Sequence, residues 1–353
     1  MPDSNSLDFK IFHSITEVDA GDWDRLSAGR PFTSHRWYRY GETVMADCEP
    51  TYLVINQCGQ PVGRATFWRS PNEPLPIQSA FLRHIFGTVF RHWPLLMCQS
   101  PFASIPGVIL PDLPLRKAAQ ALIGMKALEF LRQQGCSFLI MAYLPKELSI
   151  GWSKNLFSTS MPDPGTLMSL TWPSFEAWLE AGDKKDRQHY KRTLREAEKL
   201  AIRVTRHTSL EALDVDEALW LTRSVARRFG SAENPWARRM LEHLDIPERA
   251  AFLTAHMGSR LVGCGLTLED NGAQTNTLLG LADNVSYVYF MLIYESLKIA
   301  FENHIRLMRL GTGAYGLKQQ LGFALEDNNS LLINAANPML QKTTQWLGKY
   351  VGS

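Results

Sequence analysis

The chain has 353 residues, of which 45% are hydrophobic and 20% are charged, and its 37 basic and 35 acidic side chains nearly cancel. This length predicts two domains, and the composition excludes a disordered, fibrous or disulfide-rich protein. The small net charge excludes a polyanion-binding surface spread over the whole molecule, so any such site must be local.

The cysteines, the histidines and the N-terminal residues give no indication of disulfides, a metal site or a signal peptide. The five cysteines are scattered and odd in number, so we expect reduced thiols that are mostly buried. No two of the nine histidines have a ligand-like spacing with an acidic residue between them, so no metal site is expected. Residues 1–10 lack the apolar stretch of a signal peptide, and no later run is long enough to span a bilayer. We expect a cytoplasmic protein without a transmembrane segment; the sequence leaves its oligomeric state open.

One string of elements occurs twice along the chain. Residues 52–69 and 252–268 each have the pattern of a strand, a glycine turn and a second strand that opens on Val-Gly. Each is followed downstream by an amphipathic helix and at once an apolar strand, over residues 117–144 and 288–313. A hairpin followed by a helix and a strand predicts a mixed sheet with a crossover connection. We therefore predict an α/β fold of two tandem domains whose hairpins occupy equivalent places.

The predicted organisation has three consecutive parts. They are an N-terminal domain over 1–160, a bridging strand and helical hairpin over 161–200, and a C-terminal domain over 201–353. An insertion at about 70–107 distinguishes the first copy from the second, because prolines mark both of its ends.

Within this insertion, Phe81, Ile85 and Val89 share one helical stripe. Basic side chains stand nearby: Arg83, His84, Arg91 and His92. The stripe is consistent with a lid, an acyl-chain contact or a lipid-surface contact. Apolar helical stripes more often belong to a core, so we interpret it as a short core helix with a basic solvent edge.

The bridging segment contains a helix with a stripe of cations. Ser174 is placed to cap the first helix of the hairpin, and the second helix carries Arg187, Lys191, Arg195 and Lys199 at intervals of four. Such a stripe can bind the phosphates of a nucleotide-linked acceptor, a CoA tail or a tRNA acceptor stem. It can equally be a solvated face that Glu196 and Glu198 partly neutralise.

Three segments together resemble one protein family. They are residues 31–42, 172–204 and 310–323, and their order is similar to that in FemAB-like proteins, which include peptidyl-bridge aminoacyltransferases and CelD-like acyltransferases. The resemblance runs over roughly nine tenths of the chain and implies a double GNAT fold. No nucleophile elbow and no P-loop occur, which excludes serine-hydrolase and phosphoryl-transfer chemistry.

The last of these segments has the most specific match. It fills every position of the family pattern, with Gly311, Gly313, Tyr315, Lys318 and Gly322, and the resemblance places these residues in the cleft of the second GNAT unit. We expect Lys318 to stabilise the oxyanion of acyl transfer and Tyr315 to donate a proton to the leaving group or to orient the acceptor. The structural alternative is a tyrosine packed on the sheet and a solvated surface lysine.

Two further matches are less complete. CoA-using GNAT enzymes hold pyrophosphate on a glycine-rich turn at a helix start, where this chain has the bulky residues 284–290, including Tyr289. Those side chains hinder close backbone approach. Near the N-terminus, Trp37 matches a family position that precedes an acceptor-binding cation, and Arg36 and Arg39 are the available cations. Trp37 is otherwise a core anchor of the first helix.

These observations predict an N-acyltransferase or aminoacyltransferase. The acceptor would be an amine on an amino sugar, a peptide or a small metabolite. The donor would be acyl-CoA, a carrier-protein thioester or aminoacyl-tRNA, and no tightly bound cofactor is expected. The alternative is a non-catalytic GNAT-like protein that recognises a saccharide or a nucleotide-linked precursor.

Overall fold

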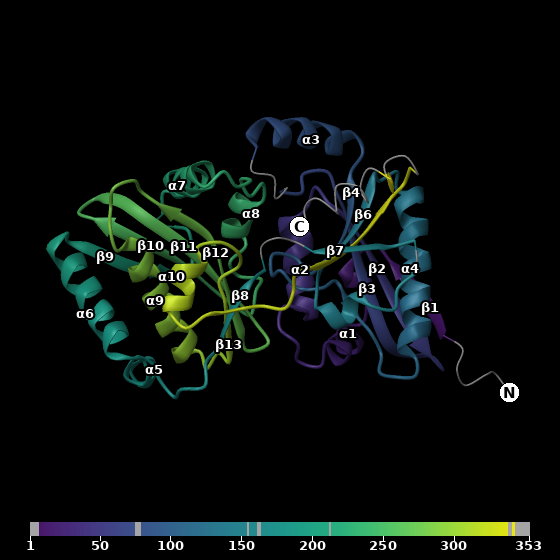
Figure 1. Ribbon diagram of the computed structural model, residues 1–353, viewed down its shortest axis with the longest axis horizontal. Helices are drawn as coiled ribbons and strands as arrows, with labels where there is room; N and C mark the ends of the chain where they lie inside the picture. The colour runs from purple at the N-terminus through teal and green to yellow at the C-terminus, as the bar shows by residue number, and fades with distance from the viewer. Residues whose placement is uncertain are drawn as a thin grey trace. The chain divides into compact units, whose positions relative to one another are not determined.

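The computed structural model describes six stretches of the chain, which are residues 7–74, 79–153, 155–160, 164–211, 213–337 and 341–342. The chain forms two compact units, each built on its own sheet (Figure 1). The first unit combines Met1–Glu73, His84–Gly165 and Glu326–Ser353, and the second combines Pro74–Arg83 and Thr166–Leu325. The first unit thus includes Glu326–Ser353, which follows the second unit in sequence. The predicted ranges instead assign these residues to the C-terminal domain.

The sheet of the first unit has the strand order β1-β2-β3-β4-β6-β15-β7, with β5 paired to β3. Among its described strands, only the neighbours β4 and β6 run parallel. Its strands are β1 (Leu7–Phe12), β2 (Glu49–Gln57), β3 (Gln60–Ser70), β4 (Leu95–Cys98), β5 (Val108–Ile109), β6 (Phe138–Leu144), β7 (Phe157–Ser160) and β15 (Ser330–Ala335).

The sheet of the second unit has the order β14-β8-β13-β12-β11-β10-β9. In the part of this sheet that the structure describes, only β12 and β13 run parallel. Its strands are β8 (Thr166–Ser169), β9 (Ile202–His207), β10 (Arg249–Met257), β11 (Arg260–Asp270), β12 (Ala273–Leu281), β13 (Leu307–Arg309) and β14 (Ala324–Leu325).

The two sheets repeat one plan, and the predicted hairpins occupy matching places in it. β2 and β3 form one antiparallel hairpin and β10 and β11 the other. Each hairpin has its register shift at the same point, between Ile55 and Asn56 in the first and between Ala255 and His256 in the second. Each parallel pair is joined through one helix, α4 (Arg116–Gln133) or α9 (Val288–Glu302), as predicted. The mixed α/β fold class is therefore confirmed.

Strands β4 and β12 correct the sequence analysis. Residues 95–98 form β4 in the middle of the sheet although they were expected within the insertion, and residues 273–281 form β12, which was not predicted. β4 is a run of four buried apolar residues, so it lacks the alternation that marks a half-buried strand. The helical part of the insertion is α3 (Ala80–His92), between β3 and β4.

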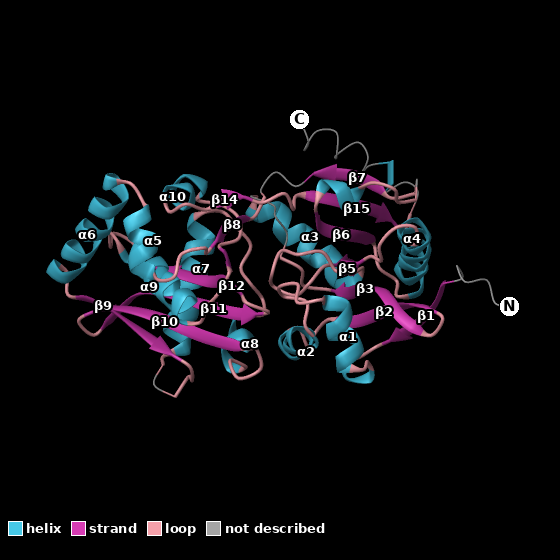
Figure 2. Cartoon of the chain, turned by 90° about the horizontal axis from the view of Figure 1, so that it is seen from below, coloured by secondary structure: helices cyan, strands magenta, loops and turns pink. Residues whose placement is uncertain are grey.

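Helices cover both faces of each sheet (Figure 2). In the first unit, α4 packs on the face that carries Phe67, whose ring lies 5.5 Å from that of Phe130. The opposite face carries α1 (Ala20–Ser27) and α2 (His35–Val44), where Trp23 lies against Arg64 of β3. In the second unit, Gly263 of β11 faces α9, while Gly280 of β12 faces α7 (Val215–Arg228). One hydrophobic core lies between α4 and the first sheet, and another lies between α9 and the second sheet.

The predicted helical hairpin is present in the second unit. Helix α5 (Phe175–Ala181) begins at Ser174, whose hydroxyl accepts the Ala177 N–H at 3.2 Å. Helix α6 (Lys184–Lys199) begins at Asp183 with a capping box, in which Asp183 and Asp186 accept each other's N–H groups. The remaining helices of this unit are α8 (Ala237–Glu242) and α10 (Tyr315–Gln320).

The interpretation of α3 as a core helix is wrong. Phe81 and Ile85 are exposed to solvent and Val89 is only half-buried. The apolar stripe exists, but no described segment covers most of it. None of the described helices is long and apolar enough to cross a membrane.

Candidate active site of the second unit

The parallel strands β12 and β13 separate soon after they begin to pair. Their paired Cα positions run only from Ala273 and Leu307 to Thr275 and Arg309. β12 continues for six residues beyond Thr275, so its later backbone groups have no partner on β13. In α/β sheets, ligands bind outside the carboxyl ends of parallel strands, and this separation lies at such an end.

A β-bulge interrupts β12 at the same place. Its register with β11 jumps between Thr277 and Gly280, and Leu278 adopts a left-handed conformation with φ of 51°. A bulge leaves the extra residues without ladder partners, so neither neighbouring strand pairs with Leu278 or Leu279. A Cβ on Gly280 would lie 2.8 Å from Leu221, so only glycine lets α7 approach this closely. The bulge therefore leaves Leu278 and Leu279 without a ladder partner on β11 or β13.

A pocket of about 210 Å³ adjoins the bulge. It lies between α7, α8 and β12, and its floor includes Leu278 and Leu279. Two charged residues at its wall form an ion pair, with Arg223 Nε and Glu233 Oε2 3.8 Å apart. The other charged or polar lining residues are Thr222, Ser231, Asn234, Arg238 and Thr277. The pocket thus combines backbone groups with a half-exposed carboxylate.

Lys318 fixes the loop that follows β13. Its ammonium donates to the carbonyl oxygens of Leu310 at 2.7 Å, Gly311 at 3.1 Å and Thr312 at 2.9 Å. A lysine ammonium has three donors, so these bonds use all of them. The side chain is buried, and burial lowers the pKa of the ammonium to about 8. The solvated-surface alternative is therefore wrong, and the observed role of Lys318 is to hold the loop. Its predicted contact with an oxyanion stays a prediction.

The other motif residues shape the same loop. Gly311, Gly313 and Gly322 all have positive φ, at 64°, 76° and 92°, a region that disfavours side chains. Tyr315 is half-buried at the first position of α10, so it follows the loop directly. The motif thus specifies a tight connection that starts where β13 leaves β12.

The start of α9 differs from a glycine-rich phosphate turn, as the sequence indicates. Asn284 and Tyr287 have positive φ, at 61° and 69°, and no side chain caps the first turn. The Tyr289 hydroxyl is buried with no hydrogen-bond partner among the described residues, and burial raises its pKa to about 12. The Arg192 guanidinium lies 5.8 Å from the ring of Tyr287. This turn keeps backbone donors, although its side chains crowd them.

The cation stripe of α6 divides into two kinds of residue. Arg187 is half-buried and donates to the carbonyl oxygens of Glu180, at 3.0 Å, and Gly182, so it caps the end of α5. Arg195 and Lys199 are exposed beside Glu196, at 3.7 and 2.9 Å, and Lys191 is exposed. Only the last three present their charge to solvent.

The two site residues predicted in the first unit differ in exposure. Trp37 is fully buried, and its indole N–H donates to the Pro101 carbonyl at 2.9 Å, as a core anchor does. Arg39 is exposed on α2. Acceptor binding by either residue stays a prediction.

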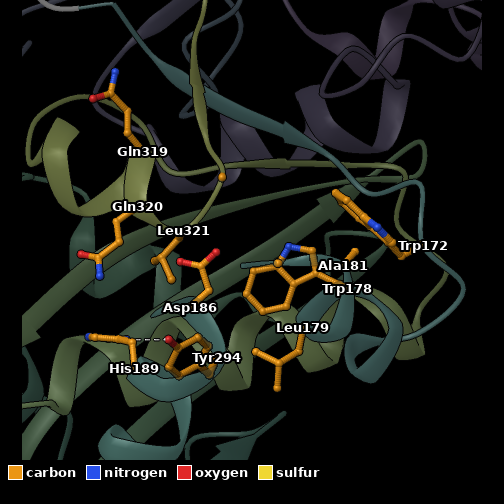
Figure 3. Close-up of a pocket in the computed structure, with 12 residues that line it drawn as sticks. Trp172, Trp178, Leu179, Ala181, Asp186, His189, Tyr294, Gln319, Gln320 and Leu321 are labelled. Atoms are coloured by element: carbon orange, nitrogen blue, oxygen red, sulfur yellow. Dashed lines mark hydrogen bonds between the residues drawn. The ribbon is translucent and has the colours of Figure 1, made fainter. Parts of the chain in front are cut away.

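A second, aromatic pocket of about 240 Å³ lies among α5, α6, α9 and α10 (Figure 3). The Trp178 indole and the Asp186 carboxylate lie on one side and Gln319 and Gln320 of α10 on the other. His189 Nδ1 and the Tyr294 hydroxyl are hydrogen-bonded at 2.9 Å. Burial, assisted by Arg192, lowers the pKa of His189, and burial raises that of Tyr294. Trp172, Leu179, Ala181, Gly182, Leu321 and Gly322 complete the lining.

A family model described as peptidoglycan biosynthesis/recognition, FemAB-like, matches residues 14–351. The chain belongs to the FemAB-like family. The predicted recognition is thus confirmed, and the family places this FemAB-like chain among acyl- and aminoacyltransferase-type proteins. No curated protein sequence matches it significantly.

Solved structures share the tandem fold of this FemAB-like chain. FemX has a TM-score of 0.59 at 10% identity, covering 95% of this chain and 99% of its own. A tandem GNAT protein from the clavulanic acid biosynthesis pathway has 0.56 at 14% identity, covering 94% and 99%. The C-terminal domain of a putative lysylphosphatidylglycerol synthetase from Agrobacterium fabrum has 0.54 at 10% identity, covering 94% and 97%. At these identities the likeness shows the fold alone, which confirms the expected double GNAT architecture.

Sequence reasoning did not find the pocket beside the bulge in this FemAB-like chain. Glu233 and Arg223 lie on the connection between α7 and α8 and on α7 itself, where no motif marks them. The one available signal was Gly280 within an otherwise apolar run, because an isolated glycine in a strand suggests a bulge. The aromatic pocket had no spacing signal, since its residues come from four helices and the loops beside them.

Among the described residues, no three His, Cys, Asp or Glu side chains gather as a metal site would require. Cys48, Cys98, Cys136 and Cys264 are buried thiols, and Cys58 is exposed.

Proposed function

We propose that the protein transfers an acyl or aminoacyl group from an activated donor to an amine, at the bulge of β12. The observation that carries this proposal is the coincidence of the bulge at Leu278 with the end of β12–β13 pairing. Backbone N–H groups released from the ladder there can donate to a carbonyl oxygen as it becomes an oxyanion. They do so without reorganising, because the surrounding sheet holds them in place.

The acceptor amine binds in the pocket beside the bulge. An amine arrives mostly as an ammonium ion, which the Glu233 carboxylate attracts and from which it takes a proton. The amine nitrogen then attacks the acyl carbon, a C–N bond forms, and the C–S bond of a thioester or the C–O bond of an aminoacyl ester breaks. Tyr315 donates a proton to the departing sulfur or oxygen, and the second proton that the new amide nitrogen loses restores the Tyr315 hydroxyl. Lys318 positions the loop that carries Tyr315 and does not itself touch the acyl group.

Acyl-CoA, a carrier-protein thioester and aminoacyl-tRNA each supply a suitable donor. The crowded turn at residues 284–290 disfavours a pyrophosphate held by close backbone contact. The exposed cations Lys191 and Arg195 of α6 suit a phosphate-rich donor such as aminoacyl-tRNA. We therefore place aminoacyl-tRNA first among the donors.

Substitution of Glu233 tests this mechanism. We expect Glu233→Gln to lower turnover about a hundredfold, the usual scale for losing a general base, while donor binding persists. Product formation is measured by mass spectrometry with acyl-CoAs and aminoacyl-tRNAs against amino sugars and short peptides. Glu242→Gln is the matched control, because Glu242 lies on α8 and pairs at 3.9 Å with Arg238. Unchanged turnover in Glu233→Gln would remove Glu233 from the mechanism.

The aromatic pocket favours a second function, recognition without catalysis. Indole faces such as that of Trp178 bind sugar rings and cations, and Asp186 adds a hydrogen-bond acceptor. On this alternative the wild type transfers no acyl group, yet a saccharide or nucleotide-linked precursor raises its melting temperature. Trp178→Ala would abolish that increase. Detectable turnover by the wild type decides for the transferase.

A further inference from the structure

Helix α3 carries its apolar side chains on one side. At about 100° per residue, these side chains share an arc of about half the helix circumference. The opposite arc holds Gly87, Thr88 and the basic residues Arg83, His84 and Arg91, whereas His92 lies beside Phe81 near one edge of the apolar arc. The apolar arc consists of Phe81, Leu82, Ile85, Phe86, Val89 and Phe90.

Most of this apolar arc faces solvent. Phe81 is 72% exposed, Leu82 44%, Ile85 40% and Phe86 38%, and Trp93 just beyond the helix is 60% exposed. At one edge of the arc the Phe90 ring lies 6.1 Å from that of Phe138, and Val89 is half-buried. Single exposed apolar residues are ordinary, but a contiguous aromatic and aliphatic patch marks an interaction surface.

The segment of the chain that contains the arc carries positive charge and no carboxylate. Residues 74–111 contain neither Asp nor Glu. His84, Arg91 and His92 are exposed on α3, while Arg83 donates to the Gly230 carbonyl. A surface that pairs an apolar face with cations alone is complementary to an apolar layer lined by anions.

We propose that α3 binds the surface of an anionic phospholipid bilayer. With 13 residues the helix is about 20 Å long, so it lies in the plane of the headgroups and does not cross the hydrocarbon core. Phe81, Leu82 and Phe86 enter the acyl boundary, and Arg91 on the opposite arc adds long-range attraction to the anionic surface. We favour a bilayer over an apolar groove in a partner protein. An anionic bilayer would repel carboxylates, which this segment lacks, whereas an apolar groove makes no such demand on the charge of the segment. The proposal does not depend on transferase activity.

Vesicle flotation of the full chain tests the proposal. The probes are phosphatidylcholine vesicles with and without phosphatidylglycerol. We expect the wild type to float with the anionic vesicles, and added salt to weaken this binding. The double variant Leu82→Gln, Phe86→Gln should bind at least tenfold more weakly, because it removes two inserted side chains. Arg91→Glu should also bind more weakly and lose most of the salt dependence.

Trp220→Gln is the matched control, since Trp220 is an apolar side chain on α7 that is 56% exposed. It should float like the wild type, and circular dichroism should show all variants folded. Absence of wild-type flotation at low salt overturns the proposal. So does equal binding by the double variant. A wild-type dimer that the double variant loses, without any vesicle binding, would show instead that a second copy covers α3.

Discussion

The buried ammonium of Lys318 donates to three carbonyl oxygens and thereby stabilises the loop after β13. Lys318 lies where the sequence motif predicts a catalytic cation, yet its donors all point to the backbone of residues 310–312. The same burial that lowers its pKa also makes its removal costly, because the three carbonyl groups would lose their partner. The motif therefore encodes a loop geometry on which any chemistry at Tyr315 depends.

We expect Lys318→Met to lower the free energy of unfolding by about 2 kcal/mol or more, measured by urea denaturation. The wild type should also become more stable as the pH rises from about 8 towards 10. In that range the unfolded lysine binds a proton that the folded one has released. Lys318→Met should lack this part of the pH dependence.

Gln319→Met is the control, because Gln319 is the exposed neighbour on α10. It should match the wild type in both stability and pH dependence. A Lys318→Met variant as stable as the wild type, with low turnover, would restore the catalytic interpretation of this lysine.

At the scale of elements, the evenly spaced cations of α6 have two different roles, because one caps α5 and the others are exposed. Arg187 belongs to the stripe by spacing, but it joins α5 to α6 by donating to the last carbonyls of α5. Cations near a helix C-terminus interact favourably with its exposed carbonyls. Lys191, one turn further along α6, is exposed.

We expect Arg187→Glu to destabilise the protein by about 1–2 kcal/mol, because it removes the cap and places a like charge beside carbonyl oxygens. Lys191→Glu makes the same change of charge on the same helix and should leave the melting temperature almost unchanged. Differential scanning calorimetry compares the two. Equal melting temperatures would show that the Arg187 contacts contribute no stability.

The elements that the sequence predicted are those with local signals. Both hairpins have glycine turns between alternating strands, and α4 and α9 have clear helical periodicity followed by apolar strands. β4 and β12 were missed because one is short and uniformly apolar and the other contains the bulge at Leu278. The candidate pocket depends on that bulge and on the approach of α7, neither of which has a local pattern.

At the scale of the whole molecule, strand exchange explains why no single cut in the sequence separates the units. β15 lies between β6 and β7 in the first sheet although residues 166–325 of the second unit precede it. β8, which comes before most of the second unit, occupies the matching place in the second sheet. Pairing between such distant segments depends on tertiary structure. The sequences of β8 and β15 do not indicate which strands they pair with.

Removal of residues 326–353 tests this arrangement. A chain ending at Leu325 should lose protection from hydrogen exchange in β6 and β7, because their shared neighbour is absent. β10 and β11 should stay protected, since every strand of the second sheet remains. A chain ending at Asn337 keeps β15 and should behave as the full chain does. Persistent protection of β6 in the shorter chain would contradict this role of β15.

The position of β15 also determines the order in which the protein can mature on the ribosome. When Gly165 has been translated, β6 and β7 are complete but cannot yet meet in the native sheet. At ~5–20 residues per second, the missing strand follows only on the order of ten seconds later, after every strand of the second sheet has been made. The half that is synthesised first is therefore the half that finishes folding last. Throughout that interval its open strand edges can pair with other chains.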